Sequence, residues 1–213
     1  VLEDFGRAGR YVALLYLPAA ALLASLSPLA LRLLGGSKYL YAWRGLAFIS
    51  LGMAAYGFSI LVYSALIAMA RTRDVLKSMA AALGLEVVGS ACLAKLLGVD
   101  GVAASRALMY AFMLLVLLHL AGRGLRARLD VEAVVKASLS SALSALLVFA
   151  LGWATGFELA WLPAYLGLGV GAYLACLAVL KAVRAEDLEF LSKVFPQLSR
   201  VCAWLAKRVE ASS

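Results

Sequence analysis

Two oppositely charged residues, Glu86 and Arg106, lie inside stretches of the sequence that are otherwise mostly apolar. A charged side chain at the centre of a membrane-spanning helix costs about 2.5–3.5 kcal/mol on insertion scales unless it is paired or hydrated. Glu86 is therefore a candidate to pair with a cation, to take up a proton or to organise a nearby basic residue. The alternatives are a structural ion pair or a neutral carboxylic acid hydrogen-bonded within a helix bundle.

Arg106 follows Glu86 across a short turn, so the helices that carry them are expected to be antiparallel neighbours. At about 1.5 Å per residue, Arg106 lies about 9 Å closer to that turn, and its long side chain could extend toward Glu86. Together with Arg44, Lys95 and Lys136, Arg106 is expected to present positive charge to phosphate groups. The alternative is that these basic side chains extend to lipid headgroups.

Polar residues also recur at helical spacing in two apolar stretches: Tyr56, Ser59 and Tyr63 in one, and Ser138, Ser141 and Ser144 in the other. Such stripes are expected to face inward, where they could hydrogen-bond hydroxyl groups in a hydrated cavity. Small polar residues are also ordinary material for packing one membrane helix on another, and that interpretation stays open. A Gly167-x-x-x-Gly171 motif indicates close helix packing or association.

The elements that must position these residues are long apolar helices. The composition is 65% hydrophobic, well above the roughly 45–50% of soluble domains, and a bilayer core of about 30 Å requires about 20 apolar helical residues. The sequence therefore predicts an all-α polytopic membrane protein, a six-helix transmembrane bundle. The predicted spans are residues 11–34, 43–69, 75–97, 101–121, 131–155 and 159–183. Because the third contains Lys77, Glu86 and Lys95, we expect it to line a pore or to be covered by neighbouring helices, not by lipid.

Lys and Arg near span ends favour the cytoplasmic side of a membrane. They concentrate at the N-terminus, in the second and fourth connections and after the last span, which predicts that both termini are cytoplasmic. Aromatic residues mark the opposite ends of the spans, as an interface belt would, and they are Trp43, Trp153, Trp161, Tyr39 and Tyr41. Residues 184–213 form a charged amphipathic segment, interrupted by Pro196, which we expect along the cytoplasmic membrane surface or beneath the bundle. A solvated helix is the alternative for this tail.

Several function classes are disfavoured by the sequence. It contains no HExxH, GxSxG or phosphate-loop motif, so we expect neither an enzyme nor a cofactor. Cys92, Cys176 and Cys202 show no metal-ligand or disulfide spacing, and no metal site is expected. The net charge of +8 resides at helix ends, where it faces lipid headgroups and not nucleic acid.

Four segments in order resemble the C-terminal half of the polysaccharide or O-antigen flippases of the MATE-like superfamily. They are LRLLGGSKYLYAWRGLAFIS at residues 31–50, YSALIAMARTRDVLKSMAAALGLEVV at 63–88, LLGVDGVAASRALMYAF at 96–112 and RAEDLEFL at 184–191. The first resembles the family's outer turn, the second its cytoplasmic turn, the third its short outer turn and the fourth its acidic tail start. The resemblance covers about residues 11–191.

The resemblance implies movement of a lipid-linked oligosaccharide across the plasma membrane. It implies a mechanism in which two lobes rock about a midplane cavity, where Glu86, Arg106, Arg44, Lys136, Tyr56, Tyr63 and Ser141 would line the substrate path. A complete family member has about twelve to fourteen spans, so a second six-helix lobe is expected as a partner, either another copy or a separate chain. The alternatives are one lobe of a MATE-type exporter of organic cations, or a non-transporting scaffold or truncated remnant.

Overall fold

A computed structural model describes residues 2–126 and 130–180, and it confirms the all-α architecture with six helices long and apolar enough to cross a membrane. These are α1 (Leu2–Ser25), α3 (Trp43–Ala68), α4 (Thr72–Leu97), α5 (Val99–Arg126), α6 (Val131–Ala154) and α7 (Leu162–Val179). Three short helices join them: α2 (Ser27–Gly35), η1 (Ser37–Ala42) and η2 (Leu159–Trp161). The predicted tail at residues 184–213 lies outside the described residues.

The predicted first span, residues 11–34, was wrong at both ends. Helix α1 begins at Leu2, and the chain breaks at Leu26 before the short helix α2. The break is explained by Pro28, which lacks an N–H for the helical hydrogen-bond ladder and occupies the first turn of α2, where no such donor is needed. The last predicted span is also shorter as a helix, because its first residues form the 3₁₀ turn η2.

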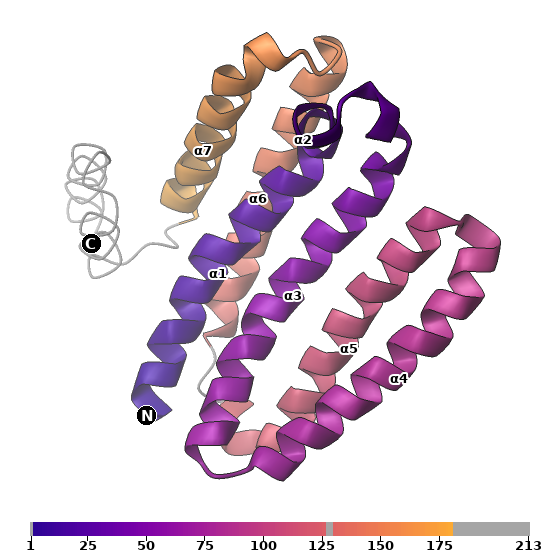
Figure 1. The fold of residues 1–213 in the computed structure, drawn as a ribbon. Coiled ribbons are helices and arrows are strands. Elements are labelled where there is room, and N and C mark those ends of the chain that lie inside the picture. Colours follow the sequence, from indigo (N-terminus) through magenta and orange to yellow (C-terminus); the bar gives the residue numbers. More distant parts are fainter. Residues whose placement is uncertain (1, 127–129, 181–213) are drawn as a thin grey trace, which may run out of the picture.

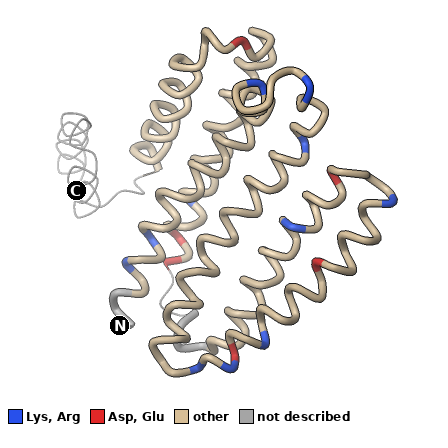
Figure 2. The backbone as a smooth tube through the Cα atoms, in the orientation of Figure 1, with Lys and Arg blue, Asp and Glu red and all other residues tan. Residues whose placement is uncertain are grey.

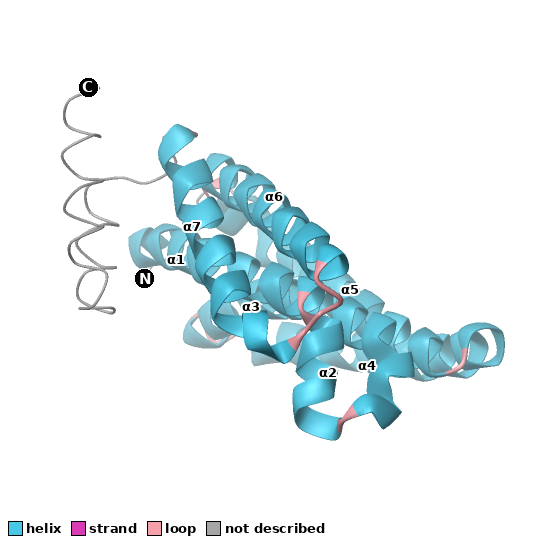
Figure 3. Ribbon diagram, turned by 90° about the horizontal axis from the view of Figure 1, so that it is seen from above, coloured by secondary structure: helices cyan, strands magenta, loops and turns pink. Residues whose placement is uncertain are grey.

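The six long helices pack in the spatial order α4, α5, α3, α1, α6, α7, so each principal contact is with the next helix in this row (Figures 1 and 3). Long helices that follow one another in the sequence run in opposite directions. The start of α1, the α3–α4 turn and the start of α6 therefore share one end of the molecule, and α7 runs back toward it (Figure 1). Figure 2 shows that most charged positions lie near the two ends of the helices.

Helix α4 lies at the edge of the row and was expected either to line a pore or to be covered by its neighbours. Within α4, all of whose residues the structure describes, only Val75, Ser78 and Ala82 are buried, so the half from Leu83 to Leu97 is uncovered except where it contacts α5. The alternative that α4 lines a pore stays a prediction, and the described helices of this chain do not cover this half. The reason is that Glu86 is paired with a neighbouring helix, which leaves apolar residues such as Leu83 and Val87 on the exposed face.

Arginine side chains tie the helix ends together. At one end Arg10 is ion-paired with Asp130 at 3.3 Å, and Asp130 in turn caps α6 by accepting a hydrogen bond from the Ala133 N–H. Arg71 donates to the Leu120 carbonyl of α5 at 2.7 Å. At the other end Arg32 of α2 donates to the Gly156 and Phe157 carbonyls at 3.0 and 2.9 Å. These contacts fix the loops between helices that are distant in sequence.

Candidate functional site

The two charged residues singled out in the sequence meet. Arg106 Nε lies 2.8 Å from Glu86 Oε1, joining α5 to α4 within the apolar length of both helices. The side chain of Glu86 is only 16% exposed, whereas that of Arg106 is 47% exposed. The expectation that Arg106 extends to Glu86 is confirmed. The pair removes the cost of an isolated charge, and the guanidinium is its accessible member.

The α4–α5 hairpin holds the pair in register. Gly101 lies so close to Leu93 that a Cβ would overlap the Leu93 carbonyl oxygen, which allows the two helices to approach tightly beside their turn. Further along, the hydroxyl of Ser105 donates to the carbonyl of Glu86 itself at 3.3 Å. The residue before Arg106 thus contacts the backbone of the residue with which Arg106 is paired, so the register of the two helices sets the ion pair.

Two tyrosines extend this cluster to α3. The guanidinium carbon of Arg106 is 6.0 Å from the ring centre of Tyr110, one helical turn further along α5, and the rings of Tyr110 and Tyr56 are 4.8 Å apart. Gly52 contacts Tyr110, and a larger residue there would overlap α5. We call Glu86, Arg106, Tyr110 and Tyr56 the charged cluster. Tyr110 was missed in the sequence, although its spacing of four residues from Arg106 places both on one helix face.

The charged cluster lies at one end of a packed hydrophobic core. From the cluster toward the α3–α4 turn, this core joins α3, α4 and α5 and includes Leu66, Val75, Ala82, Met113 and Leu117. From Leu83 to Leu97, α4 contributes no buried residue, and its main contact is with α5. An arginine in such a place can bind an anionic group with its free N–H edges while Glu86 keeps it oriented.

The other predicted site residues lie elsewhere. Arg44 stacks on Trp43 at 5.6 Å at the start of α3, and Lys136 is ion-paired with Glu132 at 2.6 Å near the start of α6. Tyr63 packs against the α3–α4–α5 core, away from the ion pair. Ser141 is buried, and its hydroxyl donates to the Ala137 carbonyl of its own helix. The structure therefore brings Glu86, Arg106 and Tyr56 together and leaves these four residues apart.

The serine stripe of α6 serves helix packing in this structure. Ser144 donates to the Gly169 carbonyl of α7 at 2.6 Å, and Ser138 donates to the Val134 carbonyl of α6 at 2.8 Å. Gly169 packs closely on α1 and α6, but no described residue lies against Gly167 or Gly171. Close packing at these two glycines is therefore not formed among the described helices, and association through this face of α7 stays a prediction.

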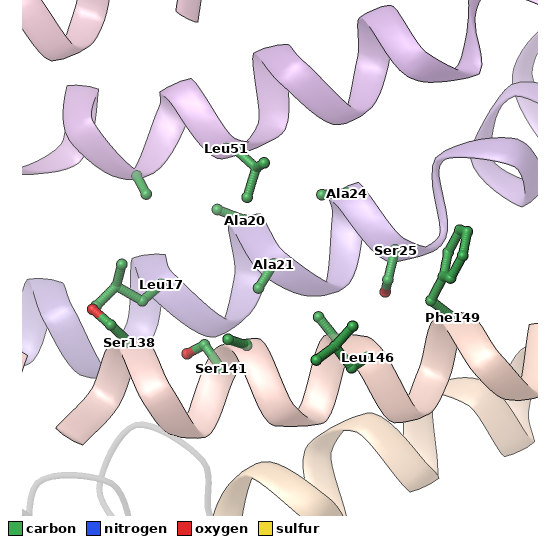
Figure 4. Close-up of a pocket in the computed structure, with 13 residues that line it drawn as sticks. Leu17, Ala20, Ala21, Ala24, Ser25, Leu51, Ser138, Ser141, Leu146 and Phe149 are labelled. Atoms are coloured by element: carbon green, nitrogen blue, oxygen red, sulfur yellow. The ribbon is translucent and has the colours of Figure 1, made fainter. Parts of the chain in front are cut away.

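A groove of about 300 Å³ lies between α1, α3 and α6, apart from the charged cluster (Figure 4). We call it the α1–α3–α6 groove, and it is lined by Leu17, Ala20, Ala21, Ala24, Ser25, Leu51, Ala54, Ser138, Ser141, Ala142, Ala145, Leu146 and Phe149. Nearly half of these residues are alanine, so the hollow arises from small side chains on tightly packed helices. Ser138 and Ser141, which the sequence predicted to face a cavity, are among these lining residues, whereas no sequence motif predicted the alanines.

Comparison with known proteins adds no assignment: the chain matches no family model, no curated protein and no solved structure. Across residues 2–126 and 130–180, no group of His, Cys, Asp and Glu side chains is placed to hold a metal ion. The chemistry available at the charged cluster is therefore that of one accessible guanidinium, one carboxylate beside it and two aromatic rings.

Proposed function

We propose that this chain is one lobe of a membrane transporter whose substrate is an anionic, lipid-linked oligosaccharide, in keeping with its resemblance to the polysaccharide flippases. The observation that carries the proposal is the unequal exposure of the ion pair, 47% for Arg106 against 16% for Glu86. A ligand approaching from the open side of α5 meets the cation first. A guanidinium matches the oxygens of a diphosphate, and adjacent tyrosines suit sugar rings.

The uncovered half of α4 supports the need for a second lobe. The described helices of this chain bury no residue of α4 from Leu83 to Leu97, so this half, which carries Glu86, would be covered only when another six-helix lobe faces it. Secondary transporters place their sites at such interfaces between repeated bundles. The partner would be another copy or a separate chain, in the plasma membrane, with both termini of this chain in the cytoplasm.

A MATE-type exporter of organic cations is less well supported. Such a protein would expose an acidic group to its substrate, whereas here the carboxylate of Glu86 is turned into its ion pair. The same cluster could serve a scaffold only as a stabilising contact between α4 and α5. Transport and scaffold therefore differ in whether Arg106 matters beyond stability.

Transport can be tested with the protein purified from its native membrane together with any chain that co-purifies, and reconstituted in liposomes. The probe is a polyprenyl diphosphate carrying a fluorescent disaccharide, and its flipping is followed by quenching with an impermeant reductant. Arg106→Gln should lower the flipping rate about tenfold or more, since a charged hydrogen bond contributes about 1.5–3 kcal/mol. Lys38→Gln, at a solvent-exposed position outside the long helices, is the matched control.

Three outcomes separate the hypotheses. Flipping of the probe but not of a neutral lipid supports the proposal, and accumulation of ethidium in place of the probe supports a cation exporter. Neither activity, from a preparation whose mass shows a stable monomer, supports a scaffold. A dimer, or a complex with a second six-helix chain, is the oligomeric state that the proposal expects.

A further inference from the structure

The α1–α3–α6 groove offers an apolar surface with no free hydroxyl donor. Its three serines, Ser25, Ser138 and Ser141, each donate their single hydroxyl proton to a backbone carbonyl of their own helix, at 2.7–2.8 Å. An occupant therefore gains hydrophobic burial and finds no hydrogen-bond donor. Since α1, α3 and α6 each have the length and composition of a membrane span, the apolar material that meets the groove is the hydrocarbon chain of a lipid.

Aromatic contacts connect one end of the groove to the side chain of Arg44. Phe149, which lines the groove beside Ser25 (Figure 4), stacks on Trp43 with ring centres 6.4 Å apart. The guanidinium carbon of Arg44 in turn lies over the Trp43 ring, 5.6 Å from the ring centre. A guanidinium stacked on a ring keeps its in-plane N–H groups available for phosphate oxygens. Among the described residues, no carboxylate is ion-paired with Arg44, and its side chain is exposed.

The spacing of Arg44 and the groove suits a single lipid molecule. Arg44 precedes the groove residue Leu51 by seven positions, which places both on the same face of α3, about 10.5 Å apart along its axis. Arg44 is in the first turn of α3, at the helix end where a headgroup would lie, and Leu51 is two turns deeper, where hydrocarbon begins. Along α3 a cation is thus followed by an apolar surface, which matches a lipid, whose phosphate headgroup is followed by its hydrocarbon chain.

We propose that the α1–α3–α6 groove binds a hydrocarbon chain of an anionic membrane lipid whose phosphate is held by Arg44. Charge complementarity selects the headgroup, and the small side chains of α1 and α6 admit the chain. The site goes beyond the transport proposal and does not depend on it, because it uses no residue of the charged cluster, although α3 contributes to both.

The test is photolabelling of the full-length protein in nanodiscs. Two probes share an acyl chain with a diazirine, and one carries a phosphatidylglycerol headgroup and the other a phosphatidylcholine headgroup. Mass spectrometry should find the phosphatidylglycerol probe enriched on Leu51, Leu146 and Phe149 over the phosphatidylcholine probe. Arg44→Gln should reduce that preference by about fivefold, the equivalent of the roughly 1 kcal/mol that one basic side chain contributes near an anionic membrane surface.

Chain binding has its own matched variants. Ala142 lines the groove and Ala150 does not, although both are exposed alanines of α6. Ala142→Phe should abolish labelling of the groove, whereas Ala150→Phe should leave it unchanged, with both variants at wild-type thermal stability. Lys38→Gln is the control for Arg44→Gln. Labelling that is equal for the two headgroups, or that persists in Ala142→Phe, would overturn the proposal, and neither result bears on flipping at Arg106.

Discussion

The hydroxyl of Tyr173 donates a hydrogen bond of 2.9 Å to the carbonyl of Leu14, linking α7 to α1. This carbonyl lacks its usual intrahelical donor, because the residue four positions later is Pro18, which has no N–H. Helix α7 packs mainly on α6, so Tyr173 gives it a specific contact with the next helix along. A proline in a membrane helix is tolerated when a neighbouring helix supplies the missing partner in this way.

Tyr173→Phe should lower the free energy of unfolding by about 1–2 kcal/mol, because it leaves the buried Leu14 carbonyl without a donor. In a Pro18→Ala background the same change should cost little, since an alanine at that position supplies the N–H that restores the intrahelical hydrogen bond. Unfolding in mixtures of mild detergent and dodecyl sulfate measures both values. Tyr16→Phe, at an exposed tyrosine of α1, is the control. Equal costs of Tyr173→Phe in both backgrounds would contradict the coupling.

Glu86→Gln and Arg106→Gln should each destabilise the protein by about 1–2 kcal/mol, less than for a fully buried pair because Arg106 is half exposed. The double variant should recover much of that loss, since it leaves no unpaired charge between α4 and α5. Thermal unfolding in detergent measures this coupling. The flipping rate of the double variant should stay about tenfold or more below that of the wild type despite its recovered stability. Restored flipping would mean that the pair only stabilises the fold.

The Lys and Arg distribution predicts that both termini are cytoplasmic, and this orientation can be tested by which loops an impermeant thiol reagent reaches in intact cells. In a variant without native cysteines, Lys38→Cys and Glu158→Cys should be labelled from outside, because both positions are exposed at the η1–η2 end of the molecule. Arg73→Cys, exposed beside the α3–α4 turn, should be labelled only after permeabilisation. The reverse pattern would invert the orientation inferred from the Lys and Arg distribution.

Arg32→Ala should loosen the loop between α6 and η2, because it removes both hydrogen bonds to the Gly156 and Phe157 carbonyls. We expect a loss of about 1–3 kcal/mol, the range for hydrogen bonds from a charged donor. Hydrogen exchange of the Phe157 amide, which donates to the Gly152 carbonyl, should quicken as well. Lys38→Ala, at an exposed residue of η1, should leave both measurements unchanged. Slow exchange in Arg32→Ala would show that the loop holds its own conformation.

The sequence predicted the parts of the fold that follow from local periodicity. Six apolar stretches became six helices, and the separation of Glu86 and Arg106 from a short turn predicted their contact. The break at Leu26 was missed because the apolar stretch continues without interruption across it, although Pro28 lies in the first turn of a new helix. The two prolines in this stretch have different outcomes: α1 continues through Pro18, whereas Pro28 begins α2.

The order of helices could not be predicted, because it depends on contacts between residues far apart in the chain. Arg32 donates to backbone carbonyls more than a hundred positions away. Likewise Arg10 pairs with Asp130. The alanine lining of the α1–α3–α6 groove was missed for the same reason, because scattered alanines form a hollow only when three helices align them.

The position of α1 between α3 and α6 has a consequence for how the protein is made. Helices enter the membrane in the order of synthesis, and α1 emerges more than a hundred residues before α6. During that interval the side of α1 that includes Ala13, Leu14 and the Leu14 carbonyl lacks the helices that cover it in the folded chain. The surroundings of α1 are complete only when α6 and α7 arrive, so α1 depends on helices made well after its neighbour α3.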